Sequence, residues 1–126
     1  MSDSDLRQAL LGTWRLIRRA EGDNPQGYLV YTPDGHVCVQ YVIRAERNWP
    51  GPEILEMPIT QALVALGFFA YCGTFEIRDG QAIHHREFGV FPSMTGNIET
   101  RSVMLDGERL ILGVPGGAQL EWQRIH

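Results

Sequence analysis

The stretch Leu11-Gly12-Thr13-Trp14-Arg15-Leu16 decides the fold. Its Gly-x-Trp follows a segment that predicts a short helix and opens a segment that predicts a strand. The chain ends on Leu120-Glu121-Trp122-Gln123-Arg124-Ile125, which offers a partner for this stretch. If the first and last strands are neighbours, Arg124 can lie across the Trp14 indole and close the sheet into a ring.

Length and composition place the chain among ordinary globular proteins. A chain of 126 residues predicts one domain, 1–126, that can bury a core without disulfides or bound metal ions to stabilise it. With a net charge of −4, the chain lacks the excess of positive charge that attracts nucleic acid or an anionic membrane, so neither is an expected partner. Residues 1–5 have no signal-peptide pattern, and the longest apolar run, 62–70, is too short to span a bilayer. A cytoplasmic location is therefore expected.

The two cysteines lie inside predicted strands. Cys38 and Cys72 have no Cys-x-x-Cys spacing, so we expect small buried hydrophobic side chains rather than a disulfide or a metal pair.

Alternating apolar residues and short turns predict eight strands. Ser4 and Asp5 can cap a helix that continues to about Leu11. Pro33-Asp34-Gly35 and two Asp-Gly pairs then supply turns between strands. The strands are expected at about 13–20, 28–31, 37–43, 70–77, 82–88, 98–105, 109–114 and 118–125. Because helices do not separate the later strands, the sheet should be an antiparallel meander.

An apolar helix is predicted at 59–66, inserted between strands and ended by Gly67. It could pack on the outside of the sheet or form a lid over its mouth, and packing is the simpler interpretation. An eight-stranded closed barrel can hold one small ligand, whereas an open sheet would leave two edges to protect. The strand count alone also allows a β-sandwich, but Trp14 and Arg124 at opposite ends of the chain favour closure.

Several motifs together carry a resemblance. They are 11–16, Gly27 to His36 (GYLVYTPDGH), 71–75 (YCGTF), 83–85 (IHH), Phe91-Pro92 with Gly96, Arg101 and 105–110 (LDGERL). In this order they resemble the bacterial and fungal lipocalin-like domain family over nearly the whole chain. The resemblance implies an eight-stranded calycin barrel with an interior cavity. Its members are functionally heterogeneous, often regarded as small-molecule binders, and some related small barrels catalyse isomerisation or cyclisation. Nothing matches residue by residue from Trp49 to Phe69.

Two adjacent histidines are candidate chemical groups. Because side chains alternate along a strand, His84 and His85 point to opposite faces, and either could face the interior. The alternation groups His84 with Arg86 and Phe88. The resemblance falls on the pair followed by Phe91-Pro92 and so slightly favours His84.

Glu99 and Arg101 share one face of the next strand and can form a neutralising pair. Arg101 could hold a carboxylate or stabilise an enolate, and Tyr71 or Tyr41 could assist a histidine that titrates near neutrality. In the simpler interpretation these groups satisfy one another at a barrel rim. The candidate catalytic residues are His84, His85, Arg101 and Tyr71.

Five further side chains are candidate ligand contacts, although those near predicted loops more often only pack. They are Tyr41, Glu99, Phe91, Met94 and Phe69. No metal site is expected, because adjacent histidines on a strand cannot easily share one ion. No cofactor is expected either, and nucleotide chemistry is unlikely because no segment is typical of a phosphate-binding loop. The sequence also has no Ser/His/Asp signature.

Two functions of different classes follow. One is a binding module that holds a small hydrophobic or amphipathic molecule in the barrel. The other is a cofactor-free isomerase, cyclase or lyase acting on a polyketide- or terpenoid-like molecule. A dimeric structural protein with a solid interior is a third interpretation, and exposed edges or the inserted helix could support a homodimer.

Overall fold

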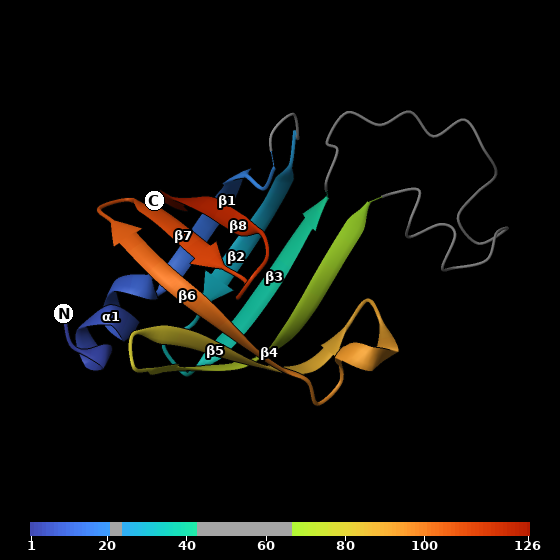
Figure 1. The fold of residues 1–126 in the computed structure, drawn as a ribbon, viewed down its shortest axis with the longest axis horizontal. Coiled ribbons are helices and arrows are strands. Elements are labelled where there is room, and N and C mark those ends of the chain that lie inside the picture. Colours follow the sequence, from blue (N-terminus) through green and yellow to red (C-terminus); the bar gives the residue numbers. More distant parts are fainter. Residues whose placement is uncertain (21–23, 43–66) are drawn as a thin grey trace, which may run out of the picture.

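The strands close into a barrel in sequence order. The computed structural model describes residues 1–20, 24–42 and 67–126. Each strand pairs antiparallel with the next, and β8 returns to β1 (Figure 1). The strands are β1 (Gly12–Arg18), β2 (Gln26–Tyr31), β3 (His36–Val42), β4 (Phe68–Arg78), β5 (Gln81–Gly89), β6 (Ile98–Asp106), β7 (Arg109–Gly113) and β8 (Gln119–Ile125).

This arrangement confirms the predicted mainly β, eight-stranded up-and-down barrel and excludes the sandwich. The predicted helix at 59–66 lies outside the described residues. No helix in the part of the chain that the structure describes is long and apolar enough to cross a membrane.

Helix α1 (Asp3–Leu10) covers one end of the barrel. It begins before the predicted cap at Ser4 and Asp5, because Ser2 is the N-cap and forms a capping box with Asp5. The Asp3 carboxylate accepts hydrogen bonds from both backbone N–H groups of the β4–β5 turn, at 2.9 Å each. Arg7 Nη2 donates to the Pro33 carbonyl in the β2–β3 turn. The helix is thus tied to two turns at the same end (Figure 1).

The predicted closure contact is present at this end. Trp14 of β1 lies directly opposite Arg124 of β8, and the Arg124 guanidinium carbon lies 4.2 Å from the centre of the indole. The same guanidinium donates to the carbonyls of Ala9 and Leu11, and Trp14 Nε1 donates to the Leu10 carbonyl at 2.9 Å. These bonds satisfy carbonyls that the last turn of a helix leaves without intrahelical partners. Trp14 and Arg124 therefore join α1, β1 and β8.

Alternation along the strands decides which side chains face inward. On β3, Val37 and Val39 are buried and Cys38 is exposed. Cys72 of β4 also lies on the outer face and is partly buried. The prediction that both cysteines are buried hydrophobic side chains is therefore wrong, because each is flanked in its strand by residues that face inward.

A β-bulge interrupts the alternation on β5. Gly73 pairs with Arg86 while Cys72 pairs with Phe88, so Glu87 is the extra residue. The bulge turns Phe88 outward, where it is 60% exposed, although simple alternation placed it beside His84 and Arg86. A Cβ at position 73 would lie 1.9 Å from the His85 carbonyl oxygen, so this close approach requires glycine.

Candidate functional site

A cavity of about 180 Å³ lies among inward-facing side chains of the barrel. Its wall is mainly apolar, and a few polar groups converge on it, the usual composition of a small-molecule site. The residues that line it are Arg19, Val39, Tyr41, Phe69, Tyr71, His84, Arg101, Leu112, Val114, Ala118, Leu120 and Trp122.

Two tyrosines hold His84 from both sides. Tyr31 of β2 places its hydroxyl 2.7 Å from His84 Nε2, and Tyr71 of β4 places its hydroxyl 2.6 Å from His84 Nδ1. The imidazole is only 1% exposed. A neutral imidazole has one N–H donor and one acceptor nitrogen, so one phenol accepts a hydrogen bond from it and the other donates to it. Both ring nitrogens are used within the protein.

Burial keeps this cluster uncharged near neutral pH. Burial, followed by the nearby Arg101 and Arg86 guanidinium groups, lowers the pKa of His84 to about 3. Burial raises the pKa of Tyr71 to about 12 and that of Tyr31 well above its usual value. His84 is consequently a neutral group that orients Tyr71. The expectation that this histidine titrates near neutrality is wrong, because burial lowers its pKa.

A charged cluster lies beside the tyrosines. Arg86 Nη2 donates to Glu99 Oε1 at 2.7 Å, and Arg101 Nη1 donates to Glu99 Oε2 at 3.0 Å. The Arg86 guanidinium also lies over the Tyr71 ring, 5.1 Å from its centre. One carboxylate thus serves two guanidinium groups that are largely buried. The predicted Glu99–Arg101 pair is present. Because the two guanidinium groups share one carboxylate, the cluster carries a net positive charge beside the cavity.

The predicted site residues fall into two groups. Tyr71, His84, Arg101, Tyr41 and Phe69 all line the cavity, and the rings of Tyr41 and Phe69 stack with their centres 5.1 Å apart. The slight preference for His84 over His85 agrees with this placement. Glu99 is not among the cavity-lining residues, and it contacts the cavity-lining Arg101 through an ion pair.

The remaining predicted residues lie elsewhere. His85 faces outward and places Nε2 3.1 Å from the Glu76 carboxylate, since it neighbours an inward-facing residue. Phe91 precedes the 3-10 helix η2 (Pro92–Met94) and is 38% exposed. Met94 is buried in the core, and neither Phe91 nor Met94 is among the cavity-lining residues.

Sequence reasoning missed Tyr31, Arg86 and Trp122 as members of the site. Alternation from Leu29 could have placed Tyr31 inward, and the predicted alternation places Arg86 on the same face as His84 without assigning it to the site. Trp122 Nε1 is buried and has no hydrogen-bond acceptor among the described residues, although the indole lines the cavity. Such a donor calls for an acceptor. In the described ranges no three His, Cys, Asp or Glu side chains lie together as metal ligands.

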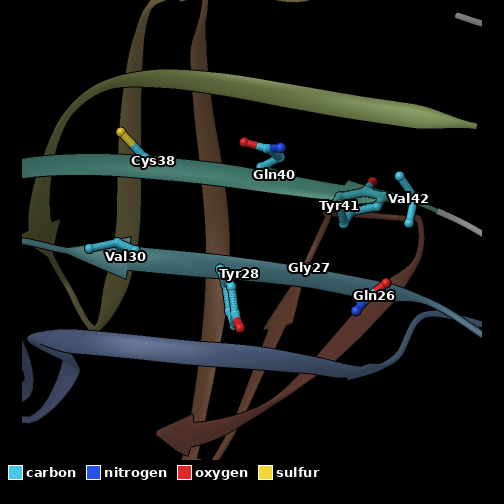
Figure 2. A pocket seen from close by; sticks show the side chains of 8 residues that line it. All are labelled: Gln26, Gly27, Tyr28, Val30, Cys38, Gln40, Tyr41 and Val42. Atoms are coloured by element: carbon cyan, nitrogen blue, oxygen red, sulfur yellow. The ribbon is translucent and has the colours of Figure 1, made fainter. Parts of the chain in front are cut away.

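A second hollow of about 450 Å³ lies on the outside of β2 and β3 (Figure 2). Its described lining includes Tyr28, Val30, Cys38 and Gln40 but no charged side chain. The inner cavity is smaller, yet it brings together two tyrosines, a histidine and Arg101. The inner cavity is therefore the better candidate for a ligand site.

Comparison with known proteins gives one match. A family model described as a lipocalin-like domain matches residues 11–124. A search of the curated proteins finds no match.

Proposed function

The chain belongs to the lipocalin-like domain family, and on this premise we propose that it binds a small hydrophobic or amphipathic molecule in the inner cavity. The observation that carries the proposal is an apolar cavity whose polar groups converge on one side. Val39, Leu112 and Leu120 offer apolar surface, and Tyr71 and Arg101 offer polar contacts. At about 180 Å³ the cavity suits a compact ligand, smaller than most drug-sized molecules.

The polar groups indicate how the ligand would be oriented. Trp122 Nε1 can donate to an acceptor atom, and Arg101 can face a carbonyl or an acidic group. Because Arg86 and Arg101 share one carboxylate, a ligand with a negative charge near Arg101 would improve the local charge balance. The proposal requires no cofactor.

A fluorescence titration tests the proposal with 2-naphthol and 2-naphthoate as probes. Binding should quench or shift the tryptophan emission of the protein, because Trp122 lines the cavity. Leu112→Trp should abolish binding because it fills the cavity. Met104→Trp is the matched control, since Met104 is 62% exposed on the outer face. Equal binding by both variants, with both folded by circular dichroism, would refute the cavity as the site.

One observation favours acid–base catalysis as a second candidate function. The Tyr71 hydroxyl, held by His84, shares the cavity with the Arg101 guanidinium. A phenol can donate a proton and a guanidinium can stabilise an enolate, which suits a cofactor-free isomerase, cyclase or lyase. Proton–deuterium exchange in a panel of small cyclic ketones would detect such activity. Tyr71→Phe should then lower the rate about 10²–10⁴-fold, whereas it should only weaken binding modestly in a simple binder.

A further inference from the structure

Cys38 and Cys72 lie opposite each other on the outer face of the barrel. They are register partners in the β3–β4 ladder, and both are free thiols. Cys38 is exposed and Cys72 is partly buried. The cavity does not use either side chain, and neither is a ligand of a metal cluster among the described residues.

The hydrogen-bond pattern of the ladder brings the two thiols close. Phe75 N–H donates to the Gly35 carbonyl at 3.0 Å, and these residues are in the same register as Cys38 and Cys72. Hydrogen-bonded and non-hydrogen-bonded pairs alternate along an antiparallel ladder. The β3–β4 register runs without a shift from His36 to Val42, so Cys38 and Cys72 form a non-hydrogen-bonded pair.

Side chains approach closely at such a pair, where the Cα atoms are about 4.5 Å apart. That separation lies within the range that a disulfide can bridge. The two thiols also interact in the reduced protein: burial and a hydrogen bond with Cys38 raise the pKa of the Cys72 thiol.

We infer that Cys38 and Cys72 form a reversible disulfide between β3 and β4 by exchange with a disulfide of low molecular weight. The Cys38 thiolate attacks one sulfur of that reagent, forming a mixed disulfide and releasing one thiol. The Cys72 thiolate then attacks the Cys38 sulfur, forming the internal bond and releasing the second thiol. The reagent gains two electrons, and the protons of the two cysteines end on the two released thiols.

Exposure assigns the order of the two steps. Cys38 lines the outer groove together with Val30 and Gln40, so a reagent can reach its sulfur from solvent (Figure 2). Cys72 is less accessible to a reagent in solvent, so it takes the resolving position, where the sulfur that it attacks is already beside it.

The bond would act on strands that form the cavity wall. Val39 follows Cys38 and Tyr71 precedes Cys72, and these two inward residues are themselves register partners. Oxidation would therefore tie β3 to β4 directly behind the site without removing any cavity-lining side chain. It would also constrain the unfolded chain, so the oxidised protein should melt about 5–10 °C higher.

Incubation of the full chain with oxidised glutathione tests the inference. The wild type should lose both free thiols without accumulating glutathione adducts, and peptide mapping should find Cys38 linked to Cys72 in a monomer. Dithiothreitol should restore both thiols and reverse the rise in Tm. Cys72→Ser should instead accumulate a stable adduct on Cys38, because the resolving thiol is missing.

Cys38→Ser is the matched variant for the order of the steps, and Cys72 in it should react more slowly than Cys38 does in Cys72→Ser. Both positions lie on the outer face, so both variants should keep the circular dichroism spectrum of the barrel. The inference is overturned if the wild type accumulates the Cys38 adduct as Cys72→Ser does, forms only intermolecular disulfides, or keeps both thiols.

Discussion

The two buried tryptophans of the barrel have opposite surroundings. Trp14 donates its indole N–H to the Leu10 carbonyl and lies beneath the Arg124 guanidinium. Trp122 is equally buried, but its indole N–H has no acceptor among the described residues and its ring borders a cavity. At the end that α1 covers, the polar groups of Trp14 and Arg124 have hydrogen-bond partners within the protein. In the interior, by contrast, the Trp122 N–H has no acceptor among the described residues and is available to a bound molecule.

Substitution of each tryptophan by phenylalanine should give the largest difference in unfolding free energy between the two regions. Trp14→Phe leaves the Leu10 carbonyl without its donor and loosens a filled region, so it should cost about 3 kcal/mol of unfolding free energy. Trp122→Phe loses no internal hydrogen bond and should cost only about 1 kcal/mol. Urea denaturation of both variants measures the difference. Equal losses would show that the two indoles are energetically alike.

Acid should destabilise the interior through His84. Its pKa is about 3 in the folded protein and ordinarily 6.5, so below pH 6.5 the unfolded chain takes up a proton that the folded chain does not. Above pH 6.5 the proton uptake of His84 does not lower the free energy of unfolding. Below pH 6.5 that free energy should fall by up to about 1.4 kcal/mol per pH unit toward pH 3, which amounts to about 2 kcal/mol between pH 6.5 and pH 5.

Urea denaturation at several pH values measures this slope, and the neighbouring histidine supplies the control. His84→Gln should flatten the slope, whereas His85→Gln should keep it because His85 faces outward against Glu76. If His85→Gln flattened the slope instead, the titrating group would lie on the outer face and the interpretation of the interior would be wrong.

The covered end should respond more weakly to a change that keeps its charge. Arg124→Lys cannot reproduce the guanidinium that serves the carbonyls of Ala9 and Leu11 while covering Trp14, and it should cost about 1 kcal/mol. Arg109→Lys is the control, since Arg109 is half exposed and bonds Gln123 on the surface; it should stay within about 0.5 kcal/mol. Thermal and urea denaturation measure the free energy of unfolding of both variants. If Arg124→Lys left it unchanged, the guanidinium of Arg124 would not contribute to the stability of the closed barrel.

Some members of the site could be predicted from the sequence and others could not. Alternation and the Asp-Gly turns placed Glu99 beside Arg101 and separated His84 from His85, because both features depend only on neighbours along a strand. The outward position of Phe88 could not be predicted in this way, since the bulge at Glu87 arises where the Gly73 backbone lies close to β5. The burial of Cys38 was wrongly predicted, because its apolar neighbours do not show which face is covered.

The sequence by itself determined the barrel. Period-two alternation, turn residues at short spacing, and the Trp14 and Arg124 stretches at the two ends of the chain are local patterns, and together they leave one way to close the ring. Only the tertiary structure decided that Tyr31 and Tyr71 meet on the two nitrogens of His84. Strands β2 and β5 are not neighbours in the sheet, so this contact crosses the interior and depends on the curvature and stagger of the closed barrel rather than on spacing along the chain.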